Sequence, residues 1–188
     1  MLILEDINYY PNYETASKEY NNYIKQHISN VKRSWKEVLK PFLEVTEDEK
    51  LIELLNKTGI NKIEEQIFQH DNSKYEDSEY IAYRNNFYPV CPEDHNKENQ
   101  HLYDLAWLHH QHNNSHHPQY WILYRDENTI EFLDMDFASI CEMLCDWHSF
   151  SYIKPNSTAY NWYYDNNIPL SHNTKNIVRK IIDIFNVK

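Results

Sequence analysis

Residues 13–40, YETASKEYNNYIKQHISNVKRSWKEVLK, set the fold class of this chain. Apolar side chains return there at spacings of three and four residues, which places them along one side of an α-helix. These side chains are Tyr20, Ile24, Ile28, Val31, Trp35 and Val38. We expect the helix to end before Pro41, because proline lacks the backbone N–H that a helix interior needs. The stretch therefore predicts a long amphipathic helix with one buried face.

The same helical period continues along most of the remaining sequence. We expect further helices near residues 46–57, 61–74, 78–88, 101–114, 136–150, 158–165 and 174–185, with a polar loop over 89–100. The period changes at 120–124 and 129–133, which flank a polar turn and predict a short β-hairpin. The fold class we expect is all-α, a compact helical bundle with one short hairpin near 120–133.

Length and glycine content limit the architecture further. A chain of 188 residues favours one domain. We expect a single domain over residues 1–188, in which residues 20–150 carry the site and helices at 158–186 pack on that core. The single glycine, Gly59, excludes the glycine-rich loops that bind phosphate through backbone amides.

The charge balance is acidic, with 18 Lys and Arg against 29 Asp and Glu and a net charge of −11. Duplex nucleic acid is therefore not an expected partner, and an anionic membrane would repel the chain. The acidity fits either simple solubility or carboxylates that bind a divalent cation. Three cysteines without a C-x-x-C pair argue against a disulfide framework. Because the sequence shows neither a signal peptide nor a long apolar run, we expect a cytoplasmic protein with no membrane span.

Histidine is the strongest chemical signal. Six of the eleven histidines lie within residues 101–117, HLYDLAWLHHQHNNSHH. Imidazole is the commonest metal ligand and the commonest general acid or base. If the helix continues, His110 and His117 lie about two turns apart on one side, and so do His109 and His116. The pattern favours His110 and His117 as metal ligands with His109 and His116 in supporting roles, whereas the alternative is a solvated polar helix end.

Other candidate ligands stand on apolar helix faces. His70 continues such a face and is followed by Asp71, so both can reach a cation where the helix unwinds. His27 lies on the apolar face of the first helix, where a lone histidine is otherwise a core residue. Asp146 stands in the apolar run CEMLCDWHSF, and a buried carboxylate is costly unless it is paired or binds a metal. Lys74, one turn after His70, is either an exposed lysine or a charge beside a bound phosphate.

The order of these residues along the chain is H…HD…H…H…D, all on expected helices. This order resembles the HD-domain superfamily of metal-dependent phosphohydrolases, over about residues 20–150. The segment HDNSK, residues 70–74, is similar to the HD-x-x-K form of cyclic-dinucleotide phosphodiesterases in that superfamily. The combination of HDNSK, HHQHNNSHH and CDW resembles more closely an uncharacterised family of small bacterial and phage proteins, a likeness that implies no activity.

The resemblance implies a helical bundle that binds one to three divalent metal ions. It implies the core ligands His27, His70, Asp71 and Asp146. Two histidines of the cluster, which we expect to be His110 and His117, would complete a binuclear site. We therefore expect two divalent ions, drawn from Mn, Fe, Mg, Co or Zn.

This ligand set predicts an enzyme, a metal-dependent phosphohydrolase or phosphodiesterase. Its substrate would be a nucleotide, a cyclic nucleotide or another small phosphoester, since metal ions can activate a water molecule and hold phosphoryl oxygens. Lys74 would balance the developing negative charge, with Arg84 as a further substrate-binding residue. His109 or His116 would protonate the leaving oxygen.

Two other functions fit the same residues. The superfamily fold includes diiron oxygenases with four histidines and two aspartates, and this chain can supply that set. The glycine-tyrosine-proline signature of the dinucleotide-cleaving branch is absent, so the likeness leaves the substrate class open. The second alternative is a non-catalytic protein that sequesters a nucleotide signal, with a counter-defence role in a phage. Abundant Asn, Lys, Ile and Tyr, typical of an AT-rich genome, hint at such a source.

Overall fold

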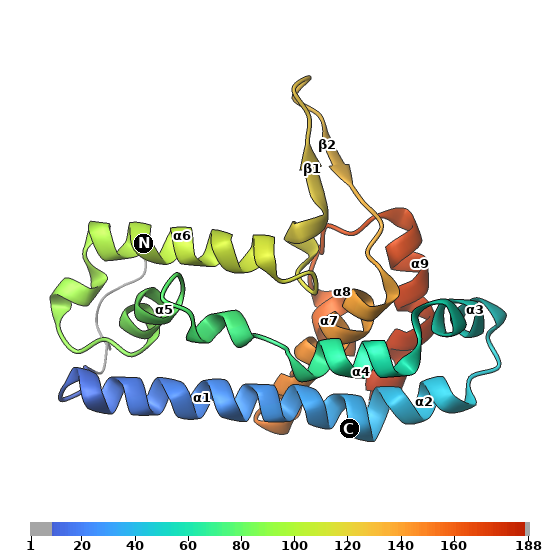
Figure 1. Ribbon diagram of the computed structural model, residues 1–188, viewed down its shortest axis with the longest axis horizontal. Coiled ribbons are helices and arrows are strands. Elements are labelled where there is room, and N and C mark those ends of the chain that lie inside the picture. The colour runs from blue at the N-terminus through green and yellow to red at the C-terminus, as the bar shows by residue number, and fades with distance from the viewer. Residues whose placement is uncertain (1–8, 187–188) are drawn as a thin grey trace. The chain divides into compact units, whose positions relative to one another are not determined.

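The computed structural model describes residues 9–186 and confirms the all-α class with one short β-hairpin (Figure 1). The helices are α1 (Tyr13–Ser34), α2 (Lys40–Val45), α3 (Glu49–Thr58), α4 (Ile60–Phe68), α5 (Tyr80–Phe87), α6 (Lys97–Asn113), α7 (Phe137–Ser149), α8 (Ala159–Asp165) and α9 (His172–Ile181). The strands are β1 (Ile122–Tyr124) and β2 (Ile130–Phe132), which pair antiparallel. A π-helical segment, Trp35–Leu39, joins α1 to α2.

The described residues form two compact units. Unit 1 comprises residues 9–26 together with Asn72–Asn113, and unit 2 comprises His27–Asp71 together with residues 114–186. The expectation of a single domain stays a prediction. In residues 9–186, no helix is both long and apolar enough to cross a membrane.

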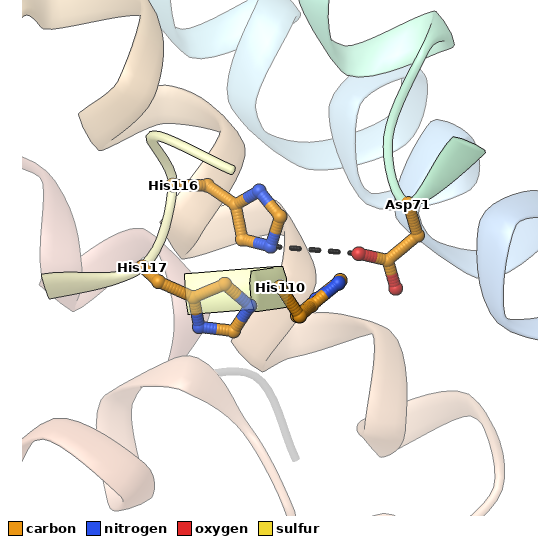
Figure 2. A group of neighbouring side chains, drawn as sticks. All are labelled: Asp71, His110, His116 and His117. Carbon is orange, nitrogen blue, oxygen red and sulfur yellow. Dashed lines mark ion pairs between the residues drawn. The ribbon is translucent and has the colours of Figure 1, made fainter. Parts of the chain in front are cut away.

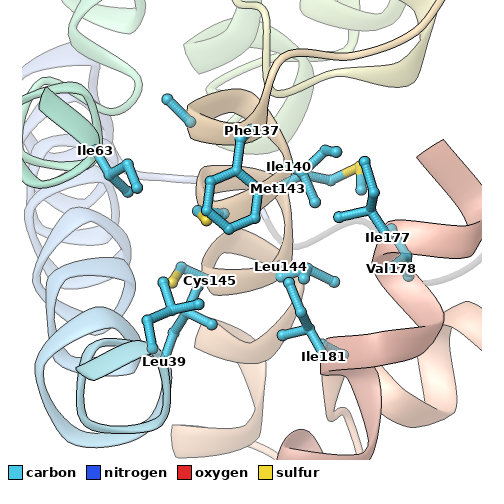
Figure 3. Packing of buried hydrophobic residues seen from close by; sticks show 14 of the residues in the cluster. Leu39, Ile63, Phe137, Ile140, Met143, Leu144, Cys145, Ile177, Val178 and Ile181 are labelled. Carbon is cyan, nitrogen blue, oxygen red and sulfur yellow. The ribbon is translucent and has the colours of Figure 1, made fainter. Parts of the chain in front are cut away.

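Helix α7 lies at the centre of unit 2. It packs against α3, α4 and α8, and all of its residues except Asp146 and Trp147 are buried. Figure 3 shows α7 side chains between Ile63 of α4 on one side and Ile177 and Ile181 of α9 on the other. Each apolar side chain buried in this way contributes about 1.5–3 kcal/mol. Helix α7 is therefore firmly held, and it can support polar groups in defined positions.

Unit 1 contains the first part of α1 together with α5 and α6. Helices α5 and α6 pack on each other. Buried Tyr20 of α1 contacts Tyr80 and Tyr88, with ring centroids 5.2 and 5.6 Å apart respectively. Aromatic contacts of this kind thus link the start of α1 to α5 within the unit.

Several helix boundaries differ from the sequence-based expectation. Helix α3 begins at Glu49 instead of near residue 46, and α4 ends at Phe68 instead of near residue 74, with a separate 3₁₀ segment at Asn72–Tyr75.

The helical path also continues past Pro41. Helix α1 ends at Ser34, the π-helical segment follows, and Pro41 lies in the first turn of α2. Proline is tolerated there, since the first turn of a helix needs no N–H from it. Helix α6 begins at Lys97 instead of near residue 101. The Asn96 side chain accepts a 2.8 Å hydrogen bond from the backbone N–H of Asn99 and caps this earlier start.

Candidate metal centre

His70 and Asp71 follow the end of α4 and enter the same buried space. The backbone of Asp71 has φ = +57°, in the left-handed region that residues other than glycine seldom adopt. Consecutive residues on a helix leave its axis about 100° apart. The reversal at Asp71 instead lets neighbouring side chains converge, and His70 Nε2 lies 3.3 Å from Asp71 Oδ2.

His27 of α1 and Asp146 of α7 bring polar atoms to the same place. His27 Nε2 lies 3.1 Å from His70 Nε2 and 3.3 Å from Asp71 Oδ2. Asp146 Oδ1 lies 3.2 Å from His27 Nε2 and 3.6 Å from His70 Nε2. On its other side, His27 has Nδ1 3.3 Å from the hydroxyl of Ser149. The structure thus brings four of the predicted metal ligands together within unit 2.

His116 and His117 approach Asp71 from the turn that precedes Pro118. His116 Nε2 lies 3.7 Å from Oδ1 of Asp71, an ion pair drawn in Figure 2. The ring centroids of His116 and His117 are 4.3 Å apart. One potential ligand atom from each of Asp71, His116 and His117 lies within 4.8 Å of the others. Asp71 therefore presents Oδ2 to His27 and His70, and Oδ1 to His116.

Glu142, which is not among the predicted site residues, lies behind two of these histidines. Its Oε1 is 2.8 Å from His70 Nδ1 and 3.0 Å from His116 Nδ1. Its Oε2 accepts a 2.9 Å hydrogen bond from the side-chain amide of Gln66. The sequence does contain a signal for this residue, because Glu142 precedes Asp146 by four positions and so shares its side of α7.

The carboxylates and imidazoles of this space change one another's protonation. Burial lowers the pKa of His70, but the charge of Asp71 and hydrogen bonds to Asp146, Asp71 and Glu142 raise it well above its ordinary value. Burial raises the pKa of Glu142, but His116 and His70 hold that pKa well below its usual range. The pKa of Asp146 is likewise raised by burial and brought well below normal by hydrogen bonds to His27 and His70. Glu142 and Asp146 are therefore ionised at neutral pH.

Imidazole nitrogen and carboxylate oxygen are the donors that divalent transition metals take in proteins. Two buried clusters in unit 2 could hold a metal ion, because their ligand atoms lie within 4.8 Å of one another. They are His27–His70–Asp146 and His70–His116–Glu142. A cation would also offset the cost of burying several carboxylates together. We call the following set the candidate metal centre: His27, His70, Asp71, His116, His117 and Asp146.

His109 and His110 lie on α6 in unit 1, where they share a buried acid. Glu79 Oε1 lies 2.9 Å from His109 Nδ1, and Oε2 lies 2.8 Å from His110 Nδ1. Burial raises the pKa of Glu79, but hydrogen bonds from His110, His109 and Ser73 lower it overall. His109 also lines an open cavity of about 400 Å³ together with Ile81 of α5. That His110 is a ligand and His109 a proton donor stays a prediction.

Lys74 and Arg84 also belong to unit 1. The Lys74 ammonium lies 6.0 Å from the ring centroid of Tyr83. The Arg84 guanidinium lies 4.8 Å from the ring centroid of Tyr13, and it donates a 3.3 Å hydrogen bond to the hydroxyl of Ser17. These contacts orient both cations within their unit, and their roles toward a substrate stay predictions.

Fold and site together define an all-α protein with buried histidine and carboxylate clusters that could hold a metal ion. The chain matches the model of a family of unknown function, DUF5662, over residues 16–184, and so belongs to that family. No curated protein and no solved structure matches it significantly. The family is of unknown function, so the candidate metal centre is the feature of this chain that indicates its chemistry.

Proposed function

We propose that this protein is a metal-dependent phosphohydrolase that acts on a nucleotide, a cyclic nucleotide or another small phosphoester. One observation carries the proposal: imidazole nitrogens of His27, His70 and His116 converge on the two oxygens of buried Asp71. The order of these residues along the chain, which resembles that of HD-domain phosphohydrolases, supports the same function.

We propose further that the centre binds two divalent cations, of Mn, Fe, Mg, Co or Zn. The ligands of the first would be His27, His70, Asp146 and Oδ2 of Asp71. The ligands of the second would be His116, His117 and Oδ1 of Asp71, so that His116 is proposed as a ligand instead of the proton donor expected from the sequence. This division follows the interatomic distances, since the two Asp71 oxygens face different histidines. Asp71 is then the residue on which both ions depend.

Divalent cations bound there would polarise phosphoryl oxygens and lower the pKa of an attacking water molecule. The chain itself prepares the ligands. Asp146 is ionised, as a carboxylate ligand must be. His70 has a raised pKa and would give up a proton on becoming a ligand, so cation binding releases protons. Burial of the ligands also strengthens electrostatic interactions in the centre, because the local dielectric constant is low.

The remaining roles are proposed from the sequence. Lys74 and Arg84 would balance negative charge on the substrate phosphate. His109 would protonate the leaving oxygen through Nε2, because Glu79 holds its Nδ1. The cysteines of the described residues are free thiols, which is typical of a reducing compartment and supports a cytoplasmic location.

Asp71→Asn is the variant that tests this function. Asparagine also accepts the left-handed backbone, so circular dichroism should match that of the wild-type protein. The variant removes the charge that both proposed ions need. Loss of a residue that only supports a metal ligand lowers metal affinity by up to roughly 100-fold. Because Asp71 is a proposed ligand itself, we expect this variant to lower metal affinity by more than that. Metal content is measured by mass spectrometry, and phosphate release is measured on a panel of nucleotides and cyclic nucleotides with Mn²⁺, Mg²⁺, Co²⁺, Fe²⁺ and Zn²⁺.

The outcomes of this experiment separate the claims. Wild-type protein without stoichiometric metal overturns the metal centre. Stoichiometric metal with no phosphate release from any substrate, under any of the five cations, overturns the hydrolase. Phosphate release that survives Asp71→Asn at the wild-type rate assigns the activity to another part of the chain or to a contaminant.

A diiron oxygenase is the second candidate, and the composition of the centre favours it. Unit 2 alone supplies the four histidines and two aspartates of such enzymes: His27, His70, His116, His117, Asp71 and Asp146. This candidate predicts two tightly bound irons, a mixed-valent EPR signal and oxygen consumption. Iron-loaded protein that hydrolyses phosphoesters without consuming oxygen excludes it.

A further inference from the structure

We propose that Glu142 is a positioning residue that fixes His70 and His116 as Nε2 ligands of the centre. This inference rests on the proposed metal centre, and it concerns a residue to which the sequence comparison assigns no role. Glu142 acts through the two imidazole rings and is not itself a ligand.

The hydrogen bonds of Glu142 decide which ring nitrogens carry protons. Oε1 lies 2.8 Å from Nδ1 of His70 and 3.0 Å from Nδ1 of His116. A carboxylate oxygen only accepts, so both Nδ1 atoms donate and both carry hydrogen. In a neutral imidazole the other nitrogen is then unprotonated and presents a lone pair. Glu142 thereby selects the same tautomer at both histidines.

The lone pairs selected in this way point toward the centre. His70 Nε2 lies 3.3 Å from Asp71 Oδ2, and His116 Nε2 lies 3.7 Å from Asp71 Oδ1. The two rings, with centroids 4.4 Å apart, thus span from Glu142 to Asp71 side by side. Ligation through either Nδ1 would require a ring to break its bond to Glu142 and turn over in a buried site.

Glu142 could instead be a ligand, since its oxygen lies within 4.8 Å of ligand atoms of His70 and His116. The hydrogen bonds argue against that role. Oε1 accepts from two imidazole N–H groups, and Oε2 accepts from the amide of Gln66 at 2.9 Å. A cation at Glu142 would have to displace these donors from a buried carboxylate, whereas the opposite ends of the rings already face another acid.

The position of the carboxylate is itself fixed. The Gln66 amide, on α4, also donates to Ser139 Oγ at 3.1 Å. The Ser139 hydroxyl in turn donates to Ser115 Oγ at 2.7 Å. Glu142 and Ser139 both lie on the buried helix α7. Two packed helices thus hold the carboxylate of Glu142 in place, and the carboxylate in turn orients the two imidazole rings.

A carboxylate behind a metal-bound histidine orients the ring and raises its basicity, and removing such a partner typically lowers metal affinity by 10–100-fold. Here one oxygen serves two rings at once. We therefore expect Glu142→Gln to lower the affinity for Zn²⁺ by about 10–100-fold while leaving the ligand set complete. The affinity is measured by competition with a chromophoric chelator.

Glu64→Gln is the matched control. Glu64 also lies in unit 2 and accepts two side-chain hydrogen bonds, from Trp35 at 3.0 Å and from Lys40 at 3.2 Å. It makes the same change from acid to amide without a histidine partner. We expect this variant to bind Zn²⁺ as tightly as the wild-type protein.

A direct readout needs no variant and no activity. Long-range ¹H–¹⁵N NMR of ¹⁵N-histidine-labelled protein identifies the protonated nitrogen of each ring, with His70→Gln and His116→Gln spectra used only for assignment. We expect Nδ1–H at His70 and His116, both in the Zn²⁺-loaded protein and in metal-free protein at a pH where each ring holds one proton. A shift toward Nε2–H in metal-free Glu142→Gln is expected at the same pH.

Each result bears on one claim. Nε2–H tautomers at both rings of the wild-type protein overturn the role of Glu142, as does a Glu142→Gln affinity equal to that of Glu64→Gln. Failure of the wild-type protein to bind any cation overturns the proposed function instead, and the metal-free spectra still decide whether Glu142 sets the tautomers. If Glu142→Gln does not fold, the wild-type spectra alone decide.

Discussion

Two buried glutamates, Glu142 in unit 2 and Glu79 in unit 1, each lie against Nδ1 of two histidines. At Glu142 one oxygen accepts both N–H groups. At Glu79 each oxygen accepts one, from neighbouring residues of α6. The histidines of Glu142 come from separate turns, and their other nitrogens face one aspartate. The histidines of Glu79 leave one helix about 100° apart.

The comparison shows that one carboxylate can hold two histidine rings that come either from separate turns or from one helix. At Glu142 the rings come from separate turns, and the backbone reversal at Asp71 and the turn at His116 let their other nitrogens converge on one aspartate. At Glu79 the rings come from consecutive residues of α6, and each binds a different oxygen of the acid.

The largest effect is expected at His70, whose Nε2 faces both Asp71 and Asp146 as a proposed ligand of the first cation. His70→Ala removes that ligand and leaves Glu142 and Asp71 less compensated. We expect metal content, measured by mass spectrometry after desalting, to fall by at least the first of the two proposed ions. His148→Ala is the control, since His148 is equally a buried histidine of unit 2 but packs on Phe185, with ring centroids 4.9 Å apart. Equal metal content in the two variants would contradict the convergence described for Glu142.

The second-largest effect is expected at Glu79, the buried acid of unit 1, as a change in the free energy of unfolding. The pKa of Glu79 is lowered in the folded state. Ionised Glu79 therefore stabilises the fold above the unfolded glutamate pKa of about 4.3, and this stabilisation is lost as the pH falls through the pKa of Glu79 in the folded protein. Glu79→Gln should cost about 1–3 kcal/mol of unfolding free energy at pH 7, and the difference from wild type should shrink below pH 4.

Urea denaturation at pH 7 and pH 3.5 measures this difference. The control is Glu131→Gln, because Glu131 is half-exposed in the hairpin and pairs with Arg125; a change within about 0.5 kcal/mol is expected there. A difference between wild type and Glu79→Gln that does not depend on pH would show that the ionised form of Glu79 contributes nothing.

The smallest effect is expected at Gln66, which holds the second oxygen of Glu142. Gln66→Ala removes one hydrogen bond to an ionised group, worth about 1.5–3 kcal/mol at most, and both imidazole bonds remain. We expect Zn²⁺ affinity to fall by less than it does in Glu142→Gln. Gln69→Ala, on an exposed position of the same turn, should leave the affinity unchanged. A loss at Gln66 larger than that at Glu142 would show that Gln66 positions the rings by another route.

Much of the fold could be predicted from the period of apolar residues. The hairpin expected near 120–133 is β1 with β2, and the helix expected from Asp136 is α7, capped by that residue through a 2.8 Å hydrogen bond from the Ser139 N–H. The passage through Pro41 could not be predicted, because the π-helical segment that precedes α2 and so places Pro41 in a first helical turn has no sequence pattern of its own. The earlier start of α6 depends on one cap, at Asn96.

Site residues could be predicted where apolar neighbours in the sequence correspond to burial in the structure. His27, His70 and Asp146 stand on apolar faces, and the structure buries them or nearly so and brings them together. The choice between neighbouring histidines could not be made by helical spacing, because His116 and His117 lie beyond the end of α6. Glu142 is absent from the predicted site, because only tertiary contacts show the two histidines beside it.

The left-handed backbone at Asp71 restricts which residues this position can hold. Glycine, asparagine and aspartate accept such a conformation most readily, and of these only aspartate carries a charge. A family member with Asn or Gly at the equivalent position would keep the turn and lose the carboxylate. Such a chain would be expected to fold without binding metal, and finding one would mark a lineage that retained the scaffold after its chemistry was lost.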